Sequence, residues 1–336
     1  MAKKKGKELP TVGVVGSGSF ATAIVKMLLE NAKLVHWCVR NEFVKGALEL
    51  RGHNPNYLTA VAFDVKKLKI TTDINELVSA CDIVVLATPS IYLADAIEKM
   101  TCDYEGKLFV SAIKGIVPKH NDVVAHYLRD VFKIGFRSQA VIAGPCHAEE
   151  VAMERLSYLT IAAAEKEHID ALRELFTSDY IKVSCSTDIL GNEYSAILKN
   201  IYAIAAGIAS GLGYGDNFNA VLVSNAIREM ELFLDAVYPE HREVNDSAYL
   251  GDLLVTAYSL FSRNRNLGNL IGKGYTVKSA VQSMSMVAEG YYATRGIYEI
   301  AYEKKLKTPI INTVFSILYE GKDAEKQFKK LTEKLT

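Results

Sequence analysis

The beginning of the chain constrains its fold most strongly, because a strand-forming run leads through a glycine turn directly into a helix. The run TVGVVG is apolar and β-branched, and ATAIVKMLLENA after the turn has the pattern of a helix. Between them, residues 16–21 read Gly-Ser-Gly-Ser-Phe-Ala, which matches G-x-G-x-x-A. Gly16 would make the tight turn, Gly18 would let backbone approach a pyrophosphate, and Ala21 would let the helix pack closely on the strand. The sequence therefore predicts a dinucleotide bound at the helix N-terminus.

Two different patterns follow along the chain. From about Thr11 to Ser184, short β-branched runs alternate with helical ones, which is typical of an α/β fold with a mostly parallel sheet covered on both faces. From Asp188 onward no convincing strand occurs, and long helical patterns such as residues 218–238 take over. We predict a Rossmann-like dinucleotide-binding domain over residues 1–186 and an all-helical domain over residues 187–336.

The composition excludes several classes of partner. Lysine plus arginine equals aspartate plus glutamate at 39 each, so no excess of positive charge indicates nucleic acid or an anionic membrane as a partner. The five cysteines form no C-x-x-C pair and the seven histidines show no ligand spacing such as H-x-x-x-H, so we expect no metal site. Beyond the basic opening residues, which we expect to be disordered, no apolar run approaches the ~20 residues that span a bilayer. We expect a cytoplasmic protein without integral membrane association.

The choice between NADPH and NADH depends on the end of the second expected strand, in LVHWCVRNE. An NAD-preferring site usually carries an acid there, about 20 residues after the glycine turn, to hold the ribose hydroxyls. This chain has Arg40 near that place, and an arginine can bind the 2′-phosphate of NADPH. Alternatively, Arg40 is a solvated charge and Glu42 is the acid. NADPH is favoured, and both cofactors stay open.

A lysine within an apolar helix is the first candidate for chemistry. Lys199 lies in EYSAILKNIYAIAAGIAS, which is apolar on nearly every side and is typical of a buried helix. Burial lowers the pKa of a lysine, and a lysine tuned in this way can donate and accept protons. Alternatively, its methylenes lie along apolar surface and its ammonium reaches water. The helix alone does not decide between these interpretations.

Three further features can carry chemistry. Lys114 in SAIKGI follows a strand, at the edge where open α/β sheets bind ligands. Asp252 in LGDLLVT follows a glycine and begins an apolar run, so it is either a site residue or a helix cap. The run Ser262-Arg263-Asn264-Arg265 offers donors suited to a phosphate, with a solvated basic turn as the alternative.

The combination of GSGSFA, IKG, AGPCHAEE, LKNIYAIAAG, LGDLLVT, SRNR and MVAEG resembles the NAD(P)-dependent glycerol-3-phosphate dehydrogenases of the bacterial type. The motifs occur in family order from about Val12 to Gly321. The resemblance implies reversible reduction of dihydroxyacetone phosphate, a phosphorylated triose, to sn-glycerol 3-phosphate for glycerophospholipid synthesis. It also implies a homodimer and a C-terminal domain like that of 6-phosphogluconate dehydrogenase.

The resemblance further implies a role for each matching residue. Lys199 would be the proton donor and acceptor, Lys114 would contact the substrate carbonyl, and Asp252 would contact the substrate and help to position the catalytic lysine. The other implied substrate contacts are Gly144, Cys146, Thr256, Ser262, Arg263 and Asn264. Gly16, Gly18, Ala21 and Arg40 are already predicted to lie at the cofactor. The resemblance adds the cofactor contacts Ser19, Phe20, Lys114, Ala148, Arg263, Val287 and Glu289.

One segment departs from the family pattern. The family usually reads G-P-[ST]-F-A where this chain has Gly144-Pro145-Cys146-His147-Ala148. A thiol is a weaker hydrogen-bond donor than a hydroxyl, so the side-chain contact at Cys146 is weakened while the backbone of Gly144 stays usable. We expect His147 to be a packing substitution rather than a catalytic residue.

Two other functions compete with this one. Another two-domain dehydrogenase could act on a hydroxy acid or keto acid, but a carboxylate substrate does not require the SRNR run. A catalytically silent dinucleotide sensor should have lost a charged site residue, whereas Lys114, Lys199, Asp252 and Arg263 are all present.

Overall fold

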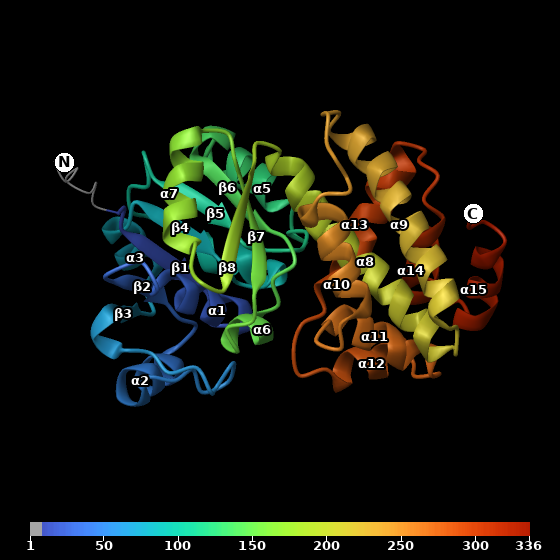
Figure 1. Cartoon of the computed structure of the whole chain (residues 1–336), viewed down its shortest axis with the longest axis horizontal. Helices are drawn as coiled ribbons and strands as arrows, with labels where there is room; N and C mark the ends of the chain where they lie inside the picture. Colours follow the sequence, from blue (N-terminus) through green and yellow to red (C-terminus); the bar gives the residue numbers. More distant parts are fainter. Residues whose placement is uncertain (1–8) are drawn as a thin grey trace.

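The computed structural model describes residues 9–336, which form a strand-rich half and a helical half (Figure 1). The opening residues for which we expected disorder lie outside this range. The sheet has the order β3-β2-β1-β4-β5-β6-β7-β8, and its neighbours pair in parallel except β6 with β7. The strands are β1 (Val12–Val15), β2 (Val35–Cys38), β3 (Leu68–Thr71), β4 (Ile83–Leu86), β5 (Leu108–Ser111), β6 (Gln139–Ala143), β7 (Ser157–Ala163) and β8 (Ile181–Ser186). The predicted mostly parallel sheet is confirmed.

Both faces of the sheet are covered by helices. Alternate residues of one strand face opposite sides, and in β4 Ile83 and Val85 belong to one apolar cluster while Val84 and Leu86 belong to another. This double burial explains why the central strands are apolar throughout. The covering helices are α1 (Ser19–Leu28), α2 (Glu42–Arg51), α3 (Ile74–Ala80), α4 (Leu93–Ile97), α5 (Val124–Phe132), α6 (Ala148–Ala152) and α7 (Lys166–Phe176).

The order of the strands reverses between β1 and β4, which lie side by side at the centre of the sheet. Ligands of open α/β sheets bind at such a switch point, beyond the carboxyl ends of the strands. The glycine turn follows β1 at this edge. Gly16 has a φ of +127°, and a Cβ there would lie 2.6 Å from the carbonyl oxygen of Ala87 after β4. Only glycine fits this position without strain.

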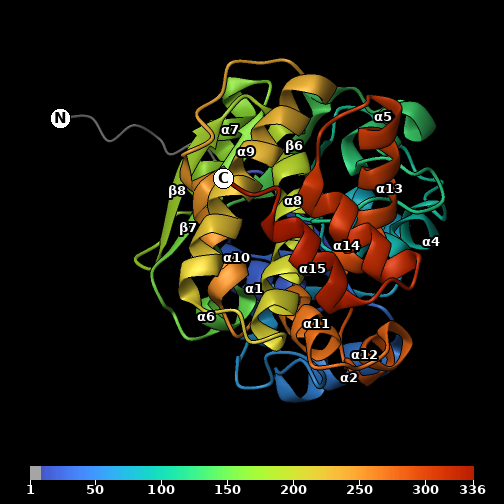
Figure 2. The same cartoon turned by 90° about the vertical axis from the view of Figure 1, so that its right-hand side faces the viewer.

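The helical half is built round one long helix. In Figure 2, α8 (Ile189–Gly211) is surrounded by other helices, and all but its last two residues are buried. The surrounding helices are α9 (Asp216–Val237), α10 (Asp252–Tyr258), α11 (Arg263–Gly272), α13 (Glu289–Glu303) and α14 (Pro309–Tyr319), with α12 (Val277–Ser283) and α15 (Ala324–Thr332) outside them. A π-helical turn, η4 (Ser247–Gly251), leads directly into α10.

Glycines bring α11 into backbone contact with α8. A Cβ on Gly268 of α11 would meet the carbonyl oxygen of Ile204, and one on Gly207 of α8 would meet that of Arg265. This close approach holds the first residues of α11 at a defined place beside the middle of α8.

The sheet and the helical half share part of their core. Val141 of β6 and Ala162 of β7 belong to the same apolar cluster as Ile197, Leu198 and Ile201 of α8. The chain passes from β8 to α8 through two residues, 187 and 188. The predicted division into 1–186 and 187–336 stays a prediction. No helix within residues 9–336 is long and apolar enough to cross a membrane.

Candidate active site

Two lysines and one aspartate form a charged cluster where the two halves meet. Lys199 is 4% exposed and Asp252 is 1% exposed. The Nζ of Lys199 donates to Oδ1 of Asp252, and the Nζ of Lys114 lies 3.3 Å from Oδ2 of the same carboxylate. Asp252 therefore joins both ammonium groups, and the alternative in which Lys199 reaches open water is wrong. The helix-cap alternative for Asp252 is also wrong, because its side chain caps no helix.

Burial and mutual charge determine the protonation of this cluster. Burial lowers the pKa of Lys199 to about 7, with Asp252 acting against the shift and Lys114 adding to it. Burial by itself would raise the pKa of Asp252, but Lys114 and Lys199 together hold it below its ordinary value. Asp252 is thus ionised at neutral pH, and Lys199 can both donate and accept a proton there.

Lys114 follows a strand of the sheet and forms polar contacts with the helical half. It follows β5 at the carboxyl edge, and its Nζ also donates to the carbonyl oxygen of Gly144 at 3.3 Å. Its own carbonyl accepts from Nδ2 of Asn200 at 2.9 Å, so the residue after Lys199 holds the Lys114 loop. Its ammonium lies 5.5 Å from the centre of the Phe20 ring.

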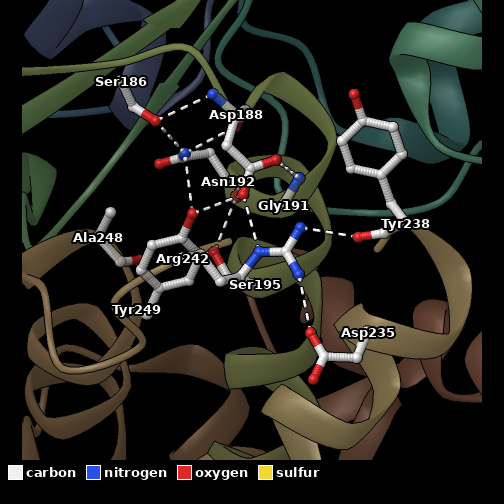
Figure 3. A network of polar contacts seen from close by, with 10 residues as sticks. All are labelled: Ser186, Asp188, Gly191, Asn192, Ser195, Asp235, Tyr238, Arg242, Ala248 and Tyr249. Atoms are coloured by element: carbon white, nitrogen blue, oxygen red, sulfur yellow. Dashed lines mark hydrogen bonds and ion pairs between the residues drawn. The ribbon is translucent and has the colours of Figure 1, made fainter. Parts of the chain in front are cut away.

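A buried polar network fixes the start of α8 (Figure 3). Asp188 caps α8 by accepting from the backbone N of Gly191 at 2.8 Å. Its Oδ2 accepts from Nε of Arg242 at 2.9 Å and from the hydroxyl of Tyr249 at 2.8 Å. The side chain of Arg242 is only 3% exposed, so its charge is compensated mainly by Asp188.

The same network fixes the segment that carries Asp252. Tyr249 lies in η4, three residues before Asp252, and its hydroxyl also accepts from Nδ2 of Asn192 in α8 at 3.3 Å. The helix that carries Lys199 and the turn that leads into Asp252 are thus bound to one another away from the cavity. No local pattern predicts this network, because Asp188 lies 54 residues before Arg242 and 61 residues before Tyr249 in the chain.

A cavity of about 190 Å³ lies over the charged cluster. Most of the predicted substrate contacts line it, namely Lys114, Cys146, Lys199, Asp252, Thr256, Ser262, Arg263 and Asn264. Gly144 is absent from its wall and contributes its carbonyl oxygen to Lys114 instead. Arg265, the last residue of the basic run, also does not line it.

The basic run forms the N-terminus of α11. Ser262 caps the helix by accepting from the backbone N of Arg265 at 3.2 Å, and Ser262 and Asn264 are buried, which argues against a solvated turn. The Nε of Arg263 is buried without a hydrogen-bond partner in the described chain, although another of its nitrogens lies 3.7 Å from Glu149. An unpaired guanidinium N–H beside free helical N–H groups suits an anion.

A larger cavity of about 640 Å³ adjoins the first and runs along the glycine turn. The two share wall residues, among them Gly18, Ser19, Arg263, Val287 and Glu289. Of the other predicted cofactor contacts, Gly16 and Arg40 line the larger cavity, and Phe20 and Ala148 line the smaller one. Ala21 lines neither and is buried in α1, as its packing role requires. Glu42, the alternative acid, lines neither cavity and accepts from Thr72.

Glu289 links the two halves at the boundary of these cavities. Its carboxylate accepts from the backbone N of Ser90 at 2.9 Å and from the Ser90 hydroxyl. Burial raises the pKa of Glu289, while these hydrogen bonds favour its charged form. No sequence motif predicts the roles of Ser90 and Asn54. Asn54 is fully buried and donates to the carbonyl of Ser17 at 3.0 Å inside the glycine turn.

The segment that departs from the family pattern, residues 144–148, lies against the same cavity. Burial raises the pKa of the Cys146 thiol to about 12, so it is neutral and unreactive at physiological pH. His147 also lines the cavity. Within residues 9–336, no group of three His, Cys, Asp or Glu side chains is arranged to hold a metal ion.

Comparisons with known proteins give a consistent result. The family model of the NAD-dependent glycerol-3-phosphate dehydrogenase N-terminus matches residues 11–169, and that of the C-terminus matches residues 188–329. An NAD(P)+ glycerol-3-phosphate dehydrogenase of Chlorobium limicola is 34% identical over 318 residues, covering 94% of this chain and 95% of its own. One of Latilactobacillus sakei is 30% identical over 328 residues, covering 96% of both chains. The crystal structure of glycerol-3-phosphate dehydrogenase from Coxiella burnetii has a TM-score of 0.90 at 25% identity, covering 97% of this chain and 100% of its own.

Proposed function

The chain belongs to the NAD-dependent glycerol-3-phosphate dehydrogenase family, and we propose that it catalyses the reversible NAD(P)H-dependent reduction of dihydroxyacetone phosphate to sn-glycerol 3-phosphate. The observation that carries this proposal is the buried cluster of Lys199, Asp252 and Lys114, in a small cavity that opens into a dinucleotide-sized one. A ketone reductase needs such a proton donor beside its hydride source.

The residues round the larger cavity fit a dinucleotide. Around Gly18 no atom would lie within 4 Å of an added Cβ, so backbone there is open to a pyrophosphate. The N-terminus of α1 supplies unpaired N–H groups, with Ser19 at its first position. Arg40, exposed at the end of β2, would hold the adenosine end, and Val287 and Glu289 the nicotinamide end. When bound, the reduced nicotinamide supplies a hydride to the substrate carbon.

Lys199 would act as the general acid. In reduction its ammonium donates a proton to the carbonyl oxygen, and in oxidation the neutral amine takes the proton back. Lys114 remains beside that oxygen and stabilises its developing negative charge. Asp252 holds both lysines and keeps the pKa of Lys199 from falling further.

The phosphate would bind at the N-terminus of α11. The unpaired Nε of Arg263 and the side chains of Ser262 and Asn264 supply donors there. Binding energy from the phosphate then orients the carbonyl against Lys199, so a distant group contributes to catalysis.

The first experiment mixes purified protein with NADH or NADPH and dihydroxyacetone phosphate and follows the loss of reduced nicotinamide absorbance. Turnover is expected with at least one cofactor, and a 2-oxo acid without a phosphate serves as the control substrate. Absence of turnover with both cofactors would overturn the proposal, and preference for the 2-oxo acid would favour the hydroxyacid dehydrogenase alternative.

We also propose a cytoplasmic homodimer whose product supplies glycerophospholipid synthesis. The five cysteines form no disulfide, which fits a reducing compartment. Several large apolar side chains are exposed near the end of α10, which suits a surface buried by a partner. They are Leu254 (40% exposed), Tyr258 (44%), Leu260 (76%) and Phe261 (45%). Light scattering that gives a mass of one chain would contradict the dimer.

A further inference from the structure

One histidine of the substrate cavity has no function in the mechanism above. His147 lines the cavity of about 190 Å³, and its Nε2 is buried without a hydrogen-bond partner in the described chain. Nearly all buried polar atoms in folded proteins have a partner, so an unpaired one at a ligand cavity indicates a group that the ligand supplies. A packing role alone does not explain this nitrogen, since the phenylalanine of the family pattern would pack without it.

The second ring nitrogen determines what Nε2 can do. The backbone of Val255 in α10 lies close enough to the ring to raise its pKa, and because Nε2 has no hydrogen-bond partner, we assign the single N–H of the neutral ring to Nδ1. A neutral imidazole carries one N–H, so Nε2 then presents a lone pair. Burial, together with the charges of Lys199 and Lys114, lowers the pKa of His147 to about 4. The ring is therefore neutral at physiological pH, and Nε2 is an acceptor only.

An acceptor selects for a donor on the ligand. The phosphate of the substrate is largely ionised and the ketone oxygen has no proton, so both are acceptors and pair with the cations of the cavity. The remaining polar group of dihydroxyacetone phosphate is its primary hydroxyl, which is also present in the product. Cys146 does not compete for this nitrogen, because no hydrogen bond joins its thiol to His147.

We propose that Nε2 of His147 accepts a hydrogen bond from the primary hydroxyl of the substrate and thereby makes the enzyme select a hydroxymethyl ketone over a methyl ketone. This inference rests on the proposed function and adds a specificity-determining residue to it. Val255 belongs to α10, the helix that begins at Asp252, so the backbone group that favours this tautomer and the carboxylate of the catalytic cluster come from one element.

The test compares two substrates that differ only at this hydroxyl. Dihydroxyacetone phosphate and acetol phosphate share the ketone and the phosphate, and acetol phosphate has a methyl group in place of the hydroxymethyl group. The ratio of their kcat/KM values is measured for the wild type, His147→Phe and His147→Gln. The intrinsic effect of the hydroxyl on ketone reactivity is the same for all three proteins and cancels when the ratios are compared.

We expect His147→Phe to lower the ratio about tenfold, through loss of activity toward dihydroxyacetone phosphate with little change for acetol phosphate. His147→Gln, whose amide oxygen can accept the same hydrogen bond, should keep most of the preference. An equal loss for both substrates, or an unchanged ratio, would overturn the proposal and leave His147 a packing residue. Failure of the wild type to reduce dihydroxyacetone phosphate would contradict the proposed function instead.

A second measurement covers the case in which His147→Phe does not fold. The imidazole ¹⁵N signals of histidine-labelled wild-type protein, assigned with His147→Gln, report the protonation of each nitrogen. We expect an unprotonated Nε2 whose signal moves toward the hydrogen-bonded range when sn-glycerol 3-phosphate binds together with the reduced cofactor. A protonated Nε2, or no change on binding, would overturn the proposal.

Discussion

At the scale of single residues, the chemistry of Lys199 depends on its burial and on Asp252. Removal from water lowers the pKa of the amine, and the adjacent carboxylate limits that shift. Lys199→Ala should therefore lower kcat by about 10²–10⁴-fold, the usual contribution of a general acid. Cofactor affinity, measured by fluorescence titration, should stay near the wild-type value, because Lys199 does not line the larger cavity. If turnover persists, Lys114 is the next candidate for the acid.

The pH dependence of the reaction follows from the same lysine. Reduction requires the ammonium form, so kcat/KM for dihydroxyacetone phosphate should fall as pH rises through about 7, the lowered pKa of Lys199. Oxidation of glycerol 3-phosphate requires the neutral amine and should show the opposite trend. In Asp252→Asn the pKa should fall further, since Lys114 then acts on Lys199 without an opposing charge, and the reduction profile should move to lower pH. A profile that is flat between pH 6 and 9 would exclude Lys199 as the titrating group.

Arg40 offers a test of cofactor choice at the same scale. It is exposed at the end of β2 and lines the larger cavity, where its guanidinium can meet a 2′-phosphate. Arg40→Ala should raise KM for NADPH about tenfold, the effect of losing one charge-assisted interaction, and change KM for NADH little. Glu42→Ala is the matched control, since Glu42 lies outside both cavities. An equal change in KM for both cofactors would show that Arg40 does not bind the 2′-phosphate of NADPH.

At the scale of the elements, the network of Figure 3 couples α8 to the turn before α10. Tyr249→Phe removes the hydroxyl that binds Asp188 and Asn192, and it should cost about 1 kcal/mol of stability. Because Tyr249 lies three residues before Asp252, we also expect kcat to fall severalfold and the pH profile to shift, with KM for the cofactor unchanged. Tyr249 would thus be a positioning residue.

A second tyrosine variant, matched to Tyr249→Phe, distinguishes a role in positioning Asp252 from a loss of protein stability alone. Tyr319 in α14 donates its hydroxyl to the carbonyl of Tyr291, and the side chain of Tyr319 lines neither cavity. Tyr319→Phe should cost similar stability and leave kcat and its pH profile unchanged. If the two variants behave alike in turnover, the network is structural only.

At the scale of the whole molecule, the strand-rich and helical halves share apolar core and polar contacts. Val141 and Ala162 of the sheet pack with α8, while Asn200 and Glu289 bind the loops of Lys114 and Ser90. We therefore expect one cooperative thermal transition, with calorimetric and van't Hoff enthalpies equal. Saturating cofactor should raise its midpoint without splitting it, because it binds the native state. Two separate transitions in the free protein would show that the halves fold independently.

Local patterns predicted the fold class and most of the residues that meet in the two cavities. The β-branched runs between about Thr11 and Ser184 form the strands of the sheet, and the glycine turn, the buried lysine and the SRNR run all lie at the expected elements. These features can be recognised in the sequence because strand alternation, turn geometry and the apolar surroundings of a buried charge each involve only a few neighbouring residues. The network round Asp188, the support of the glycine turn by Asn54 and the pairing of Ser90 with Glu289 were missed, since each joins segments far apart in the chain.

The chain order of apolar and polar residues is sufficient to specify a mostly parallel sheet followed by a helical bundle, and to supply an amine, a carboxylate and a guanidinium in recognisable motifs. Whether Asp252 caps a helix or joins two lysines, and whether Lys199 reaches water, depends on which distant segments cover them. The same holds for His147, which its motif predicts to be packing but whose Nε2 lies unpaired in the cavity. Protonation and hydrogen-bonding state are properties of an environment, and that environment exists only once the halves have packed together.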